Sequence, residues 1–310
     1  MALGAYVTKF TSRLDKIIER ETLTSDLSMN GDLLGDMTSA GEIKVAKIAM
    51  DGLGNYDRAA GFVPGSVTTD WETLKLSYDR GRQFEVDAMD DEERAAIVSA
   101  NVMAEFERTK VIPEVDAIRF AKLAQGAGTT VAANLTAPDA ALDAVLAGEE
   151  AVEDTGANLA QCVLYCTSAV KGLLRKAQNY RIGQGEAPNG TFSTFDDMKI
   201  VTVPSSRFVS KVTLNDGKTS GQQAGGYKAA TGAMALNFLI VHPSAVAAIQ
   251  KHQTLRYFAP DVNQGKDAHL WQYRVFHDLL VFENRKALIY AHTAATAVAA
   301  SEVSRAKAAK

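Results

Sequence analysis

The chain has 310 residues, of which 46% are hydrophobic and 23% charged, which excludes a disordered chain and is typical of a globular protein with one large domain or two smaller ones. The formal net charge of −4 argues against a strong, sequence-independent attraction to nucleic acid, because such binding requires many Lys and Arg side chains at the phosphates. No apolar run approaches the ~20 residues of a membrane-spanning helix, and the N-terminus lacks the pattern of a signal peptide, so we expect a cytoplasmic protein.

The N-terminal part of the chain predicts an arm followed by a long β-ribbon. Residues 1–41 are expected to form a short amphipathic helix and an extended arm that orders only by packing against another surface. Two strand-like runs, 43–50 and 71–87, then flank an irregular loop rich in turn residues at 52–65. A two-stranded ribbon is only marginally stable alone. If its own chain offers too little surface, residues 42–87 must lie on a neighbouring molecule, which predicts an assembly protein.

A long helix is expected directly after the ribbon. Asp90 is a suitable N-cap and Glu93 lies three residues later, as in a capping box. Apolar residues recur on one stripe of the following segment. Pro113 predicts a kink or break near Val111 and Ile112, and glycines end the helix near residue 126.

The second half of the chain predicts a compact α/β domain. A helix is expected at 134–155, and two units of similar sequence each read as a strand followed by a helix. The units comprise residues 159–166 with 167–178, and 236–242 with 243–251. Further strands are expected at 198–203, 271–276, 277–282 and 287–290, with a hairpin at 283–286 and a Gly-rich loop at 215–232.

No motif in the sequence predicts an active site. The glycine-rich stretches do not have the spacing of phosphate-binding loops, and the histidines lack metal-ligand spacing. His277 and Asp278 could form a base and its orienting carboxylate, but adjacent side chains on a strand point to opposite faces. Cys162 and Cys166 are interpreted as buried apolar residues. We therefore expect no enzyme, no cofactor and no metal site; an α/β enzyme with a lid at 215–232 is the weaker alternative.

The order of these elements is the basis of a resemblance. The run Trp71-Glu-Thr-Leu-Lys-Leu-Ser-Tyr-Asp-Arg-Gly-Arg-Gln-Phe-Glu and the segment from Leu255 to Asn284 resemble tailed-bacteriophage major capsid proteins of the Hong Kong 97 type. The resemblance implies an α+β fold. Its parts would be an N-terminal arm at 1–41, an E-loop at 42–87, a spine helix of the peripheral domain at 88–127, an A-domain at 128–253, the peripheral domain's return strands at 254–292, and a tail at 293–310.

The resemblance also implies a function and a set of partners. The chain would assemble with itself, in the host cytoplasm, into the pentamers and hexamers of an icosahedral phage head that encloses double-stranded DNA without sequence-specific binding. Portal and decoration proteins are implied partners. Many members of the family carry an N-terminal scaffolding segment, whereas this chain starts with a short arm. It either depends on a separate scaffolding protein or is a processed form, and Met1 favours the separate protein. A nanocompartment shell of the same fold that encloses enzymes is the alternative.

The ribbon carries the residues for which we predict subunit contacts: Asp57, Arg58, Trp71, Arg80 and Arg82. Its charged residues are compatible with a solvated edge that discourages unwanted pairing, or with arginines that meet carboxylates of a neighbouring subunit. Residues 51–70 contain no lysine, so the covalent Lys–Asn links of some family members are not expected. The A-domain loop 215–232 is expected near the centre of a capsomer.

Overall fold

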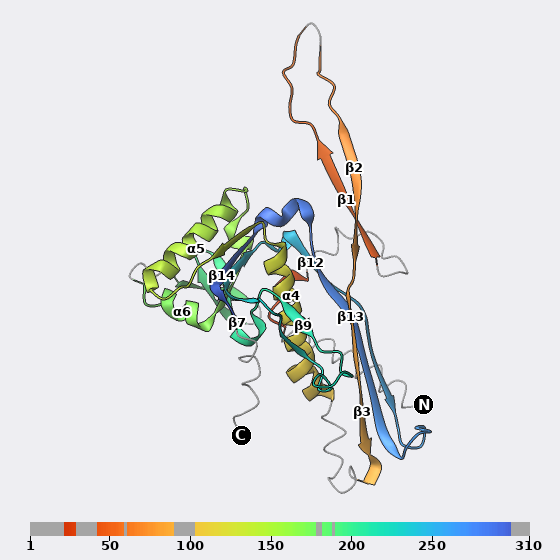
Figure 1. Cartoon of the computed structure of the whole chain (residues 1–310). Coiled ribbons are helices and arrows are strands. Elements are labelled where there is room, and N and C mark those ends of the chain that lie inside the picture. The colour runs from red at the N-terminus through yellow and green to blue at the C-terminus, as the bar shows by residue number, and fades with distance from the viewer. Residues whose placement is uncertain are drawn as a thin grey trace.

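The computed structural model combines two β-sheet units on either side of a long helix, with a slender ribbon projecting from them (Figure 1). It describes residues 22–28, 42–58, 61–89, 103–177, 182–187 and 190–298. The expected N-terminal amphipathic helix and the cap at Asp90 lie outside these residues. The α+β class predicted from the sequence is confirmed.

A mixed seven-stranded sheet forms the larger unit. Its strand order is β4-β14-β11-β5-β8-β7-β6. The strands comprise Thr129–Ala132 (β4), Val163–Thr167 (β5), Ile182–Ala187 (β6), Gly190–Phe195 (β7), Met198–Val203 (β8), Met234–Val241 (β11) and Ile289–Ala297 (β14). The central strands are buried on both faces, as expected for continuous apolar runs such as that of β5.

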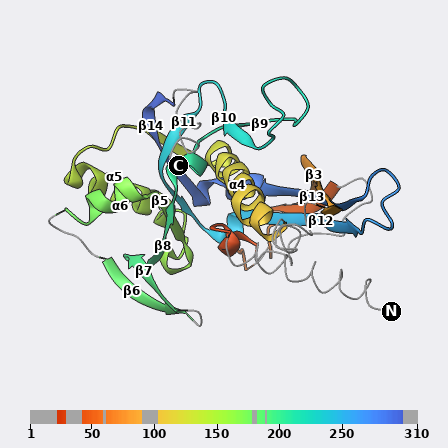
Figure 2. The same cartoon turned by 90° about the horizontal axis from the view of Figure 1, so that it is seen from below.

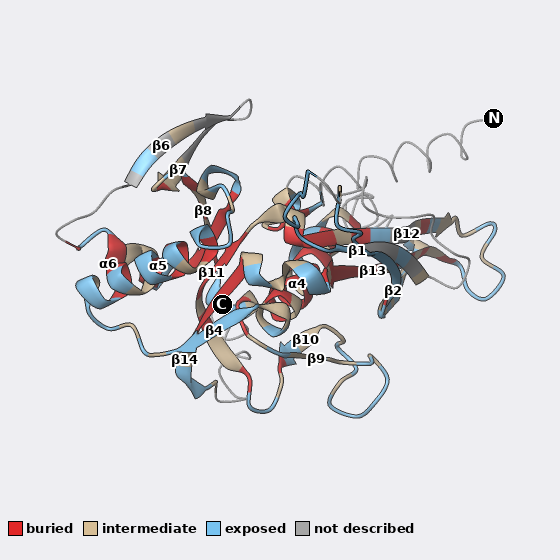
Figure 3. Cartoon of the chain, turned by 90° about the horizontal axis from the view of Figure 1, so that it is seen from above, coloured by how far each residue is buried: buried red, intermediate tan, exposed pale blue. Residues whose placement is uncertain are grey.

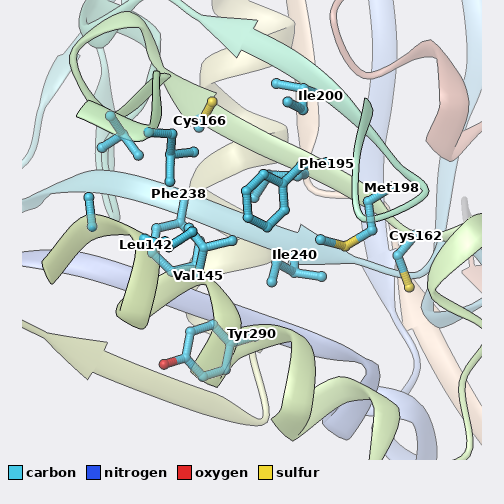
Figure 4. Packing of buried hydrophobic residues seen from close by; sticks show 14 of the residues in the cluster. Leu142, Val145, Cys162, Cys166, Phe195, Met198, Ile200, Phe238, Ile240 and Tyr290 are labelled. Atoms are coloured by element: carbon cyan, nitrogen blue, oxygen red, sulfur yellow. The ribbon is translucent and has the colours of Figure 1, made fainter. Parts of the chain in front are cut away.

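Two helices cover one face of this sheet, α5 (Pro138–Glu153) and α6 (Ser168–Leu174) (Figure 2). Alternate residues of the central strands pack against them, as Figure 4 shows for Phe238 and Ile240 opposite Leu142 and Val145. Pro138 fixes the start of α5. The start of α6 is fixed by the Thr167 hydroxyl, which accepts a hydrogen bond from the amide of Val170.

The opposite face of the sheet packs on α4 (Ile112–Gly126). Phe120 of α4 contacts Tyr165 of β5 and Phe208 edge to face, at ring-centroid distances of 5.2 and 5.1 Å. Because β5 alternates between its two faces, Tyr165 enters this core while Cys166 enters the core under α5 and α6.

The long helix runs through Pro113 without a break. A π-helical turn at Glu107–Val111 leads directly into α4, and the amide of Ile112 bonds to the carbonyl of Glu107. Pro113 has no N–H for the carbonyl of Thr109, and the wider turn accommodates that missing bond. The expected break near Val111 is therefore a local widening of one turn.

The second unit is an antiparallel three-stranded sheet in the order β12-β13-β3, comprising Val246–Phe258, Ala268–Val281 and Tyr78–Asp87. Two expectations were wrong here. The predicted helix at 243–251 is a 3-10 turn at Pro243–Ala245 followed by β12, because pairing along β13 overrides the helix propensity of its alanines. The predicted strands at 271–276 and 277–282 are one strand, β13, and a 3-10 turn rather than a hairpin leads from it to β14 in the other sheet.

The predicted 42–87 ribbon is shorter than expected. Strands β1 (Glu42–Met50) and β2 (Val67–Lys75) pair only with each other, whereas β3 leaves the ribbon and pairs with β13. A small hairpin of β9 (Val212–Leu214) and β10 (Tyr227–Ala229) holds the Gly-rich loop. This loop lies against β3, where Arg80 and Arg82 donate to its backbone carbonyls.

Candidate functional site

The ribbon of β1 and β2 ends in an ordered tip. The Asp51 carboxylate accepts hydrogen bonds from the Ser66 amide (2.7 Å) and the Ser66 hydroxyl (2.9 Å), which ties the two sides of the loop together. These bonds hold the pKa of Asp51 below its usual range. Farther out, Asp57 and Gly61 form a β-bridge, and the ring of Tyr56 lies 4.9 Å from that of Phe62.

Large apolar side chains are exposed on the outer part of the ribbon, between residues 50 and 71. Leu53 is completely exposed and Phe62 is 88% exposed. The other members of this apolar set are Met50, Tyr56, Val63, Val67 and Trp71. Seven of the eleven large hydrophobic residues that the described part of the chain exposes therefore belong to this one projection. An exposed apolar concentration of this kind marks an interaction surface.

The structure places the predicted contact residues in two groups. Asp57, Arg58 and Trp71 lie on the ribbon and are exposed to solvent. Arg80 and Arg82 lie on β3, in the body of the molecule. The five residues therefore do not form one patch.

Arg80 has its carboxylate partner within its own chain. Its guanidinium meets both carboxylate oxygens of Glu114 on α4, at 2.6 and 3.3 Å, and also donates to the carbonyls of Asn215 and Gly226. Arg82 likewise donates to the carbonyl of Gln223. Within the chain, the carboxylate that meets Arg80 is that of Glu114. Arg80 joins β3, α4 and the Gly-rich loop.

Arg80→Glu is expected to destabilise the folded chain by roughly 2–3 kcal/mol. The new carboxylate would lie next to that of Glu114, and the carbonyls of Asn215 and Gly226 would lose their hydrogen-bond donor. Urea unfolding measures the loss. Arg108→Glu is the matched control: Arg108 pairs with Glu105 at 2.8 Å, but both side chains are more than half exposed, so its effect should stay below about 1 kcal/mol. Equal effects would contradict the internal role of Arg80.

The side chains of His277, Cys162 and Cys166, considered as candidate catalytic or metal-binding groups, are buried in the body of the protein. His277 is buried, which lowers its pKa to about 3, with help from Arg119 and Arg80, so the ring is neutral. Its Nδ1 has no hydrogen-bond partner among the described residues, and Asp278 bonds to other groups. Cys162 and Cys166 are free and buried, and burial raises their pKa values to about 11 and 12. The described residues contain no group of His, Cys, Asp and Glu side chains that could hold a metal ion.

Residues 22–28 form an anchor that sequence patterns did not reveal. Leu27 is fully buried in the core beside α4. The Thr24 hydroxyl donates to Asp116 at 3.1 Å and accepts from Arg119 at 2.8 Å. Asp26 pairs with Lys199 at 2.8 Å. The sequence did contain a signal for this contact. Asp116 and Arg119 lie on the buried side of α4, and buried charged groups need polar partners from other parts of the chain.

The geometry can be compared with known proteins. No family model and no curated protein matches this sequence. Solved structures do match its fold. The capsid structure of the cyanophage P-SCSP1u matches with a TM-score of 0.59 and 12% identity over 89% of each chain. The mature capsid of bacteriophage PhiM1 gives a TM-score of 0.52 and 14% identity over 83% of each chain.

A chain from Mycobacterium phage Che8 gives a TM-score of 0.59 and 15% identity, over 87% of this chain and 90% of its own length. At such low identities the likeness establishes the fold. This chain has the fold of phage capsid proteins, as the sequence resemblance predicted. No helix among the described residues is long and apolar enough to cross a bilayer.

Proposed function

We propose that this chain is a major capsid protein that assembles with itself into the pentamers and hexamers of an icosahedral phage head around double-stranded DNA. The observation that carries the proposal is the ribbon of β1 and β2, which leaves the body with its apolar side chains exposed. In a shell this surface would be buried on a neighbouring copy, and the role of the chain would be structural rather than catalytic.

The parts of the family pattern correspond to elements of this fold. The ribbon and its tip, residues 42–75, serve as the E-loop. The helix that includes α4 serves as the spine helix. The seven-stranded sheet with α5 and α6 serves as the A-domain, and the sheet of β3, β12 and β13 as the peripheral domain. Asp57, Arg58 and Trp71 contact the neighbouring copy. Scaffolding, portal and decoration proteins are proposed partners of the assembled shell.

Electron microscopy of the expressed chain, with and without a candidate scaffolding protein, tests this function. Closed shells, capsomers or sheets are the expected result. A monomer that stays monomeric under all these conditions would refute it. Shells that fill with a co-expressed enzyme, and not with DNA in infected cells, would instead favour a nanocompartment.

The shell is expected to be held together without covalent links between subunits. Residues 51–70 of the ribbon contain no lysine, so an ε-amine that could attack a neighbouring side chain is missing from its tip. Purified particles boiled in SDS should give a single band at the 33.2 kDa of the monomer. A ladder of multiples of that mass would contradict the prediction.

A further inference from the structure

The ribbon meets the body at a two-residue link. Strand β2 ends at Lys75 and β3 begins at Tyr78, so Leu76 and Ser77 connect the isolated ribbon to the three-stranded sheet. Figure 3 shows that β13, the strand of the body that receives this link, is largely buried. The link is therefore where the direction of the ribbon is set.

Leu76 fastens the link by burial. It is only 3% exposed, although neighbouring Lys75 and Ser77 are exposed. Its side chain belongs to a small apolar cluster formed by the ends of β12 and β13, with Ala247, Ile249, Leu280 and Phe282.

Asp278 fastens the link by hydrogen bonding. Its fully buried carboxylate accepts the amide N–H of Ser77 at 3.1 Å and that of Leu279 at 2.8 Å. The ammonium group of Lys122, on α4, lies 3.5 Å from the same oxygen that Ser77 reaches. A buried carboxylate thus joins the link, β13 and the long helix.

Lys122 and the adjoining ring stack make a third attachment. The Lys122 ammonium also lies over the ring of Tyr78, 5.3 Å from its centroid, an arrangement that favours a cation–π interaction. The Tyr78 ring in turn stacks on His277 with centroids 6.0 Å apart. Lys122 therefore contacts the first residue of β3 and the β13 carboxylate that accepts the Ser77 amide.

We propose that Leu76, Ser77, Lys122 and Asp278 form a joint that fixes the direction of the ribbon relative to α4. The tip lies roughly 40 Å along the strand from this joint, at about 3.3 Å per residue. A rotation of about 15° at the joint would move the tip by ~10 Å, enough to miss a contact surface on a second copy. These four are positioning residues. Their consequence for assembly rests on the proposed function, whereas their effect on ribbon direction does not.

The direction of the ribbon can be measured in the full-length chain by double electron–electron resonance, which gives the distance between two spin labels. One spin label is attached at Val63→Cys on the tip and one at Ala169→Cys on the exposed side of α6. Cys162 and Cys166 should remain unlabelled because they are buried and their thiols are protonated. The doubly labelled parent is expected to give a single narrow distance distribution.

Leu76→Ala and Lys122→Met, each made in the labelled parent, should widen that distribution by about twofold or more, because local order depends on the contacts removed. Arg274→Met is the matched control. Arg274 and Asp79 also pair across β13 and β3, but on the exposed side of the sheet. The control should keep the distribution of the parent.

If the Leu76→Ala and Lys122→Met proteins fold and their distance distributions are as narrow as that of the parent, the proposed joint is refuted. If Leu76→Ala does not fold, Lys122→Met decides alone, since its side chain is one-third exposed. Assembly is scored separately by electron microscopy. Widened distributions together with reduced shell formation support both proposals. Widened distributions with a parent that forms no shells support the joint and refute the proposed function.

Discussion

Leu53→Ser combined with Phe62→Ser is expected to abolish shell formation and leave the chain folded. Both side chains are almost fully exposed in the monomer, so their replacement should change the free energy of unfolding by no more than about 0.5 kcal/mol. Burying each of them on a neighbouring copy would contribute about 1.5–3 kcal/mol. The double variant therefore loses ~3–6 kcal/mol at every ribbon contact of a shell.

Sedimentation and electron microscopy measure the shells, and thermal unfolding confirms that the variant is folded. Leu146→Ser is the matched control, because Leu146 is an apolar residue on α5 that is 41% exposed but far from the ribbon. It should assemble like the parent. Normal shells from the Leu53→Ser, Phe62→Ser chain would show that the ribbon tip is not a contact surface.

Hydrophobic periodicity and helix caps correctly predicted several helices and strands. The helix α5 and the strands β1, β5 and β8 lie where periodicity and caps placed them. The same reasoning predicted that the ribbon would need a partner. Its exposed apolar side chains agree with that expectation.

Elements that depend on distant partners could not be predicted in the same way. Apolar and polar residues alternate from Leu74 to Asp79, across the point where β2 ends and β3 begins. Only pairing with β13 separates β3 from the ribbon. Likewise, the alanine-rich start of β12 favours a helix until β13 is present beside it.

The candidate contact residues fall into a ribbon group and a body group because of contacts between residues far apart in the sequence. Arginine is equally suited to a carboxylate of its own chain or of another, so the sequence left the partner of Arg80 open. The three-dimensional position of Glu114 decides it. Trp71, by contrast, is 63% exposed in the described part of the chain.

Glu149 should make the stability of the chain fall as pH rises. It lies on the sheet-facing side of α5, is only 5% exposed, and its Oε1 has no hydrogen-bond partner among the described residues. Burial, together with the nearby carboxylates of Asp196 and Glu153, raises its pKa from 4.5 to about 8. The folded state therefore holds a proton that the unfolded chain releases, and unfolding becomes easier from about pH 4.5 to about pH 8.

The loss across this range should be about 3–5 kcal/mol, since one pKa unit corresponds to about 1.4 kcal/mol. Glu149→Gln mimics the protonated form, so its stability should match that of the parent near pH 4.5 and exceed it by a similar amount above pH 8. Glu150→Gln is the control, because Glu150 is the exposed neighbour on the same turn. Urea unfolding across this pH range measures all three proteins. A parent and a Glu149→Gln variant with parallel pH profiles would mean that Glu149 is ionised in the folded state, with its charge balanced by another group.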